Sequence, residues 1–147
     1  MDRSHEAAND TERARLRALV AGASDDQLRR PMPAGWTVAA VLAHVAYWDA
    51  LAIYWLDKWA ITGEPTVYEP EDTDATNGAA KPLCLALPPR LAAELSLRVA
   101  EEADAKVRAL SDAMLAKIQA KGPPPFNLSR ANHRKEHLDE IEPVLKG

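Results

Sequence analysis

The stretch "VAAVLAHVAYWDALAIYWL", from Val38 to Leu56, is the longest apolar run in the chain and decides the fold class. It is long enough to cross a bilayer as a helix. Asp49 lies inside it, however, and an ionised carboxylate near the centre of a span costs about 2.5–3.5 kcal/mol. The run also lacks a basic flank and a second apolar segment to pair with. We therefore expect a buried core helix and no association with a membrane.

The residues around this run mark where the helix begins and ends. Thr37 precedes it as an N-cap, and Gly63 and Pro65 end it after Thr62. Further helices are expected over about 4–21, with Ser4 as N-cap, over 89–121, and from Asn127 or Ser129 to Glu142. A single turn with a capping box is expected at Ser24 and Gln27. No segment has the pattern of a convincing strand, so the chain is predicted to be all-α.

The second and third of these helices are separated by a long connection. Residues 63–89 contain five prolines, an acidic cluster and an Asn-Gly pair, without a sustained helical period. A connection of this length is functional or is a crossover that lets two successive helices run parallel. We therefore predict one domain, residues 1–147, folded as a four-helix bundle with a long connection between helices 2 and 3.

Composition excludes several classes of partner and compartment. The chain has a formal net charge of -4 and no cluster of Lys and Arg, which argues against binding nucleic acid. Its single cysteine, Cys84, cannot form an internal disulfide, and the N-terminus has no apolar signal segment. The expected localisation is the cytoplasm. A catalytic role for the Cys84 thiol has no support beyond its presence, since a lone cysteine is usually a small buried hydrophobe.

Three of the four histidines occupy apolar helix faces. His133 and His137 lie one helical turn apart, and Ile141 continues their row. His44 lies in a similar row of the second helix with Val41 and Trp48. His5, in contrast, lies in a polar terminus. We expect the first three to point into the bundle.

These interior histidines allow two interpretations. Each one can be a hydrogen-bonded core residue, which is the commoner role for a single buried histidine. Together they can hold one divalent ion, which offsets the roughly 1–3 kcal/mol cost of burying each unpaired polar group. Three imidazole ligands leave a fourth position open, as in catalytic zinc sites, whereas structural sites usually close with a fourth protein ligand. The candidate metal ligands are His44, His133 and His137.

Four other residues are candidates for the pocket or for hydrogen bonds to the ligands. Trp48, Asp49 and Asn132 are the first three. Core packing is the alternative for Trp48, and a surface or helix-contact role is the alternative for Asp49. The fourth is Glu136, because "HRKEH" fits the H-x-x-E-H signature of inverted zinc proteases. A five-residue pattern is weak, and a surface charge explains Glu136 better. Glu140 is interpreted in the same way.

Two segments resemble the DinB/YfiT-like family. They are "SDDQLRRPMPAGWTVAAVLAHVAYWDA", residues 24–50, and "ANHRKEHLDEIE", residues 131–142. The matching positions are Gly35, Trp36, Thr37, His44, Trp48 and Asp49 in the first and His133 and His137 in the second. This resemblance implies a four-helix bundle with parallel second and third helices, three histidine ligands for zinc, nickel, iron or manganese, and often a homodimer.

The resemblance also implies the kind of activity. Family members include transferases and isomerases that use a low-molecular-weight thiol, and hydrolases. We therefore expect a metal-dependent transferase or hydrolase that acts on a small electrophilic substrate at the open position of the ion. The alternative is a non-catalytic helix bundle that a metal ion staples and that binds a ligand or a partner. Metal storage is disfavoured, because the relevant helix faces lack the carboxylate ligands of di-iron bundles.

Overall fold

The computed structural model describes residues 2–66, 72–121 and 128–147. In these ranges it contains seven α-helices: α1 (Ser4–Gly22), α2 (Asp25–Leu28), α3 (Val38–Thr62), α4 (Thr73–Ala86), α5 (Pro89–Arg108), α6 (Asp112–Ala120) and α7 (Ala131–Lys146). A small hairpin of two-residue strands, β1 (Pro31–Met32) and β2 (Trp36–Thr37), flanks the 3-10 turn η1 (Pro33–Gly35). The predicted all-α class is confirmed, and the short hairpin is the one departure within the described ranges.

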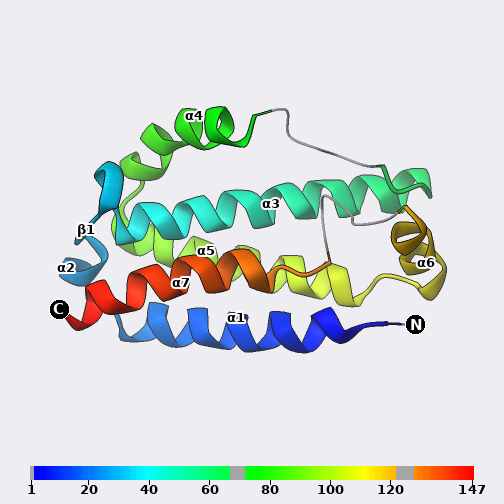
Figure 1. Ribbon diagram of the computed structural model, residues 1–147, viewed down its shortest axis with the longest axis horizontal. Helices are drawn as coiled ribbons and strands as arrows, with labels where there is room; N and C mark the ends of the chain where they lie inside the picture. The colour runs from blue at the N-terminus through cyan, green and yellow to red at the C-terminus, as the bar shows by residue number, and fades with distance from the viewer. Residues whose placement is uncertain (1, 67–71, 122–127) are drawn as a thin grey trace.

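Four long helices lie lengthwise along the molecule (Figure 1). Helices α3 and α5 run in one direction, and α1 and α7 run in the opposite direction. Helix α3 packs on α5 and α7, and α1 packs on the same two helices. Helix α4 covers one side of α3 and also contacts β2. The two helices that the long connection joins, α3 and α5, are therefore parallel.

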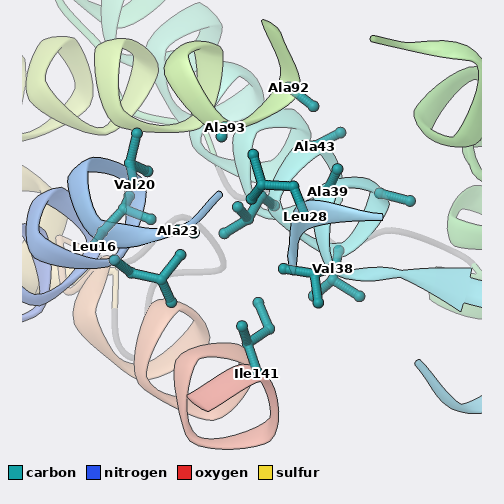
Figure 2. Close-up of a cluster of buried hydrophobic side chains, with 14 of the residues drawn as sticks. Leu16, Val20, Ala23, Leu28, Val38, Ala39, Ala43, Ala92, Ala93 and Ile141 are labelled. Carbon is teal, nitrogen blue, oxygen red and sulfur yellow. The ribbon is translucent and has the colours of Figure 1, made fainter. Parts of the chain in front are cut away.

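Small and branched side chains form the main core, at the end of the molecule that holds the hairpin (Figure 2). Ala39 and Ala43 of α3 lie near Ala92 and Ala93 of α5, and their small side chains allow the two helices to approach closely. A second cluster surrounds Trp59 of α3 at the other end of this helix.

Helix α3 is apolar enough, and long enough, to cross a membrane. Its most apolar window has a mean hydropathy of 1.4, and 61% of that window is buried inside the molecule. This burial agrees with the predicted role of α3 as the core helix of a soluble protein.

Several predicted helix ends are confirmed. Thr37 caps α3 by accepting a hydrogen bond from the backbone N–H of Ala40, and Gly63 ends it with a left-handed φ of 74°. Ser24 and Gln27 form the predicted capping box. The N-cap prediction at Ser4 is wrong, because Ser4 is the first helical residue of α1 and Arg3 precedes it without a side-chain cap.

The interpretation of residues 63–89 as a connection without helical structure is wrong in its second half. Asp72 caps α4 by accepting a hydrogen bond from the backbone N–H of Ala75. The helix then continues through Pro82. A proline in a helix interior costs about 3 kcal/mol, so the sequence favoured a loop here. Packing of α4 on α3 and β2 is available only in the folded chain and offsets this cost.

Two other boundaries also differ from the prediction. The helix expected over 89–121 is interrupted after Arg108, and Ser111 caps a new helix by accepting from the backbone N–H of Met114. The apolar period continues on both sides of this break, so periodicity alone did not reveal it. The last helix begins at Ala131, after Ser129, and it passes through Pro143 to Lys146 instead of ending at Glu142. The alternative start at Asn127 lies outside the described residues.

Candidate metal centre

The structure brings three histidines together between α3 and α7. The Nε2 atom of His133 lies 3.1 Å from the Nε2 atom of His44 and 3.1 Å from the Nε2 atom of His137. One ring nitrogen from each residue falls within 4.8 Å of the others, which is the arrangement of a group that could hold a metal ion. The prediction that these three side chains face the same interior is confirmed, whereas His5 lies on α1, outside the cluster.

The cluster disfavours protonated imidazoles. Burial, together with repulsion from the neighbouring His137, lowers the pKa of His44 to about 4. Burial also lowers the pKa of His133 to about 3, with added repulsion from His137 and His44. Both rings are therefore neutral at pH 7, and a neutral imidazole has one nitrogen with a lone pair. Three imidazoles that turn ring nitrogens toward one centre fit a divalent cation, which accepts these lone pairs.

Glu140 fixes the orientation of one imidazole. Its Oε2 atom lies 3.0 Å from Nδ1 of His137. A carboxylate only accepts hydrogen bonds, so Nδ1 of His137 donates the proton and its Nε2 atom keeps a lone pair toward the cluster. The surface interpretation of Glu140 overlooks this contact with His137. The signal was its spacing of three residues from His137, which places both side chains on one helix face.

The four predicted neighbours of the cluster have different positions. Trp48 is half-buried, and its Nε1 atom donates a hydrogen bond to Oδ1 of Asn77 at 2.9 Å. Asp49 is buried and contacts other helices. Asn132 and Glu136 lie on the exposed side of α7. The surface interpretation of Glu136 therefore agrees with the structure better than the role of a base.

Asp49 joins α3 to α7 through buried charges. Its carboxylate accepts from Nε of Arg130 at 2.9 Å and from Nε of Arg134 at 3.0 Å. Arg134 also makes a two-pronged contact with Asp104 of α5, at 2.9 Å for each hydrogen bond, and Arg13 of α1 donates to Asp104 at 2.6 Å. The helix-contact interpretation of Asp49 agrees with the structure. Arg134 lies in the interior as well, with 1% of its side chain exposed.

A residue from the other end of the chain caps α7. Oδ1 of Asn9 accepts hydrogen bonds from the backbone N–H groups of Arg130 and Ala131, at 2.8 and 3.1 Å. Its Nδ2 atom donates to the carbonyl of Leu128 at 2.9 Å. The first N–H groups of a helix need such partners, and Arg130 itself provides no side-chain cap. Asn9 and Asp49 together therefore fix the start of α7, two residues before His133.

A pocket of about 580 Å³ opens beside the histidines. Its volume is in the range of small-molecule sites. The polar lining residues are His44, His137, Asn77 and Glu140, and the apolar ones are Met32, Pro33, Trp36, Val41 and Val144. The hairpin supplies Trp36, whose ring meets His44 edge-on with 5.7 Å between ring centroids.

The surroundings of Cys84 do not favour a reactive thiol. It is a buried residue of α4 with 7% of its surface exposed, and burial raises the pKa of its thiol. A raised pKa lowers the fraction of thiolate, which is the nucleophilic form.

The fold and the site define a class: small all-α proteins in which interior histidines of two helices meet beside a pocket. A model of the DinB superfamily matches residues 8–134, and the chain belongs to this superfamily. The matched segment includes His44 and His133 and ends before His137. No curated protein and no solved structure matches the chain at a significant level.

Proposed function

We propose that the protein is a metal-dependent enzyme with a DinB-type four-helix bundle, formed by α1, α3, α5 and α7. His44, His133 and His137 would hold one divalent ion, and the reaction would be a thiol-dependent transfer to, or a hydrolysis of, a small electrophile. The observation that carries this proposal is the convergence of three imidazole nitrogens beside a pocket of about 580 Å³.

The side chains around the cluster have separate tasks in this proposal. Glu140 holds the His137 ring with its Nε2 lone pair toward the centre. Asp49 and Asn9 hold the first turn of α7, and so they set where His133 stands relative to His44. The apolar pocket wall excludes water from a bound substrate. A divalent ion at the histidines supplies Lewis acidity, which activates a water or a thiol or polarises a carbonyl group.

The donor set supports an open site. Three neutral nitrogens suit zinc, nickel, iron or manganese, and availability of the metal decides among them. Glu140, which supplies the carboxylate of the pocket wall, is hydrogen-bonded to His137 and is therefore not counted as a ligand. The described residues thus supply three candidate ligands, the three histidines. Three protein ligands leave a position for a substrate or a low-molecular-weight thiol. The homodimer implied by the family resemblance and the cytoplasmic location expected from the composition stay predictions.

Titration of the metal-free protein with Co²⁺ tests the ligand assignment. We expect one Co²⁺ per chain, with the visible absorption of a four- or five-coordinate ion. His44→Ala should weaken binding by more than 100-fold, while His5→Ala, which removes the histidine outside the cluster, should leave it unchanged. Equal affinity of His44→Ala and the wild-type protein would show that the ligand assignment is wrong.

A non-catalytic, metal-stapled bundle is the second candidate. The hydrogen bond between Glu140 and His137 favours it. Because of this hydrogen bond, the carboxylate of Glu140 is less available to act as a base in the pocket. A screen of the metal-loaded protein with small thiols and electrophiles separates the two candidates. Turnover that disappears in His44→Ala supports the enzyme, whereas metal-dependent stability without turnover across the screen supports the staple.

A further inference from the structure

Asn77 of α4 has an amide whose orientation is set by its neighbour. The indole Nε1 atom of Trp48 lies 2.9 Å from Oδ1 of Asn77. An indole N–H donates and does not accept, so it selects the oxygen of the amide as its partner. The Nδ2 group, with its two N–H donors, is therefore on the other side of the amide. Because Asn77 lines the pocket, these donors are available to a molecule bound there.

The remaining lining residues decide what kind of molecule fits. Trp36, Val41 and Val144 form apolar walls, together with Met32 and Pro33 of the hairpin. An apolar or aromatic group gains free energy by burial against such walls, and a flat ring suits the indole of Trp36. An amide donor in an apolar pocket needs an acceptor, because burying it unpaired is costly. The pocket therefore fits a mainly apolar molecule with one acceptor oxygen.

In the metal-free protein, the charges near the pocket favour a neutral acceptor over an anion. Glu140 places a carboxylate on the pocket wall. Lys81 of α4 is a cation beside the lining residue Trp36, and it is not itself a lining residue. Its Nζ atom donates to the carbonyl of Ala34 and lies 5.4 Å from the ring centroid of Trp36. The negative charge of Glu140 would thus repel a carboxylate ligand, and Lys81 is already hydrogen-bonded to the carbonyl of Ala34.

We propose that Asn77 anchors the ligand of this pocket by donating from Nδ2 to the carbonyl oxygen of an uncharged, mainly apolar molecule. Trp48 is a positioning residue, because it acts by holding the amide in the donating orientation. This inference rests on the proposed function for the identity of the ligand as the substrate. The binding step itself uses residues of this chain alone, so metal-free protein suffices to test it.

Three small probes of similar shape test the ligand class by NMR titration of the metal-free protein. Acetophenone has a carbonyl oxygen, ethylbenzene lacks it, and benzoate carries a negative charge. We expect acetophenone to bind roughly 2- to 10-fold more tightly than ethylbenzene, as the net effect of one hydrogen bond. Benzoate should bind most weakly. The side-chain amide signals of Asn77 should shift with acetophenone and stay in place with ethylbenzene.

Variants of α4 and α3 assign this preference to the amide. Asn77→Asp keeps an oxygen for Trp48 and removes the donor, so the preference for acetophenone over ethylbenzene should disappear. Ala79→Asp adds the same charge at an exposed position of α4 that does not line the pocket, and it should keep the preference. Trp48→Phe keeps an aromatic ring but releases the amide, so the preference should fall part of the way.

Three results would overturn the inference. The first is that the wild-type protein binds acetophenone and ethylbenzene equally, or binds none of the probes. The second is that Asn77→Asp keeps the preference for acetophenone. The third is that benzoate binds more tightly than acetophenone. The Co²⁺ titration is read separately. If Co²⁺ fails to bind while the preference holds, the metal-dependent function is wrong and the ligand anchor stands. If Co²⁺ binds and the preference is missing, the reverse applies.

Discussion

Helix α7 presents two polar rows to the interior, and they differ in how complete they are. Arg130 and Arg134 meet the carboxylates of Asp49 and Asp104, so each buried positive charge has an opposite charge from the same chain. His133 and His137 instead contact His44, so imidazole faces imidazole in the second row. The Nε2 atom of His133 lies 3.1 Å from the Nε2 atoms of the other two. The first row is complete within the protein, whereas the second forms a group of ring nitrogens that could hold a metal ion.

This difference separates a structural role from a site. Buried ions are retained when they are paired and hydrogen-bonded, and such pairs hold helices in register. Nitrogen lone pairs that converge on one point do not stabilise the contact between two helices by themselves, since each one needs a proton or a metal ion. The arginine row therefore acts as the scaffold for the histidine row, one turn of α7 away. Four experiments test this division.

The largest effect is expected when the arginine row loses a charge. Asp49→Asn leaves Arg130 and Arg134 short of a carboxylate in the interior. We expect the free energy of unfolding to fall by about 3–5 kcal/mol, measured by urea denaturation. Asp57→Asn on the same helix removes an exposed ion pair with Lys106 and should cost about 1 kcal/mol or less. Similar losses in the two variants would show that the row is not a scaffold.

Metal binding should stabilise the wild-type protein through the histidine row. Zn²⁺ at about 100 times its Kd should raise the free energy of unfolding by about 2.7 kcal/mol, because the ion binds the folded state. His137→Ala should lose this gain in the same denaturation assay. Lys135→Ala, which changes an exposed residue of α7, should keep it. A gain that survives His137→Ala would place the ion elsewhere.

Acid should destabilise the metal-free protein through the same row. The pKa values of His44 and His133 are about 4 and about 3 in the folded protein, below the unfolded value of about 6.5. The folded state therefore binds fewer protons, so stability is full above pH 6.5 and is lost as the pH falls. We expect a loss of about 2 kcal/mol between pH 6.5 and 5.5 for the two residues. His133→Gln should remove about half of this loss, and an unchanged profile in that variant would contradict the assignment.

The smallest effect is expected at the carboxylate that orients His137. Glu140→Gln weakens the acceptor for Nδ1 of His137, and we expect the Co²⁺ affinity to fall about 10-fold, which corresponds to about 1.4 kcal/mol. Glu136→Gln is the matched control on the same helix, since Glu136 is exposed and lies outside the pocket lining. A larger loss in Glu136→Gln than in Glu140→Gln would reverse the roles of the two carboxylates.

The histidine row could be predicted from the sequence, whereas the arginine row could not. His44, His133 and His137 follow the helical period of apolar neighbours, so their faces could be assigned one helix at a time. A buried arginine goes against its usual exposure unless a carboxylate is found for it. The partners of Arg134 are Asp49 and Asp104, on two other helices, and no local pattern connects them to it. The role of Asn9 was hidden for the same reason, because it caps a helix about 120 residues away.

The sequence by itself determined the all-α class, the main helices with the caps at Thr37 and Gly63, and the inward direction of three histidines. These features depend on periodicity and on local hydrogen bonds, which neighbouring residues set. Tertiary packing decided that α4 continues through Pro82, that Glu140 contacts the His137 ring, and that Trp48 donates a hydrogen bond to the amide oxygen of Asn77. These contacts depend on packing between segments distant in the chain, and their free energy exists only once those segments meet.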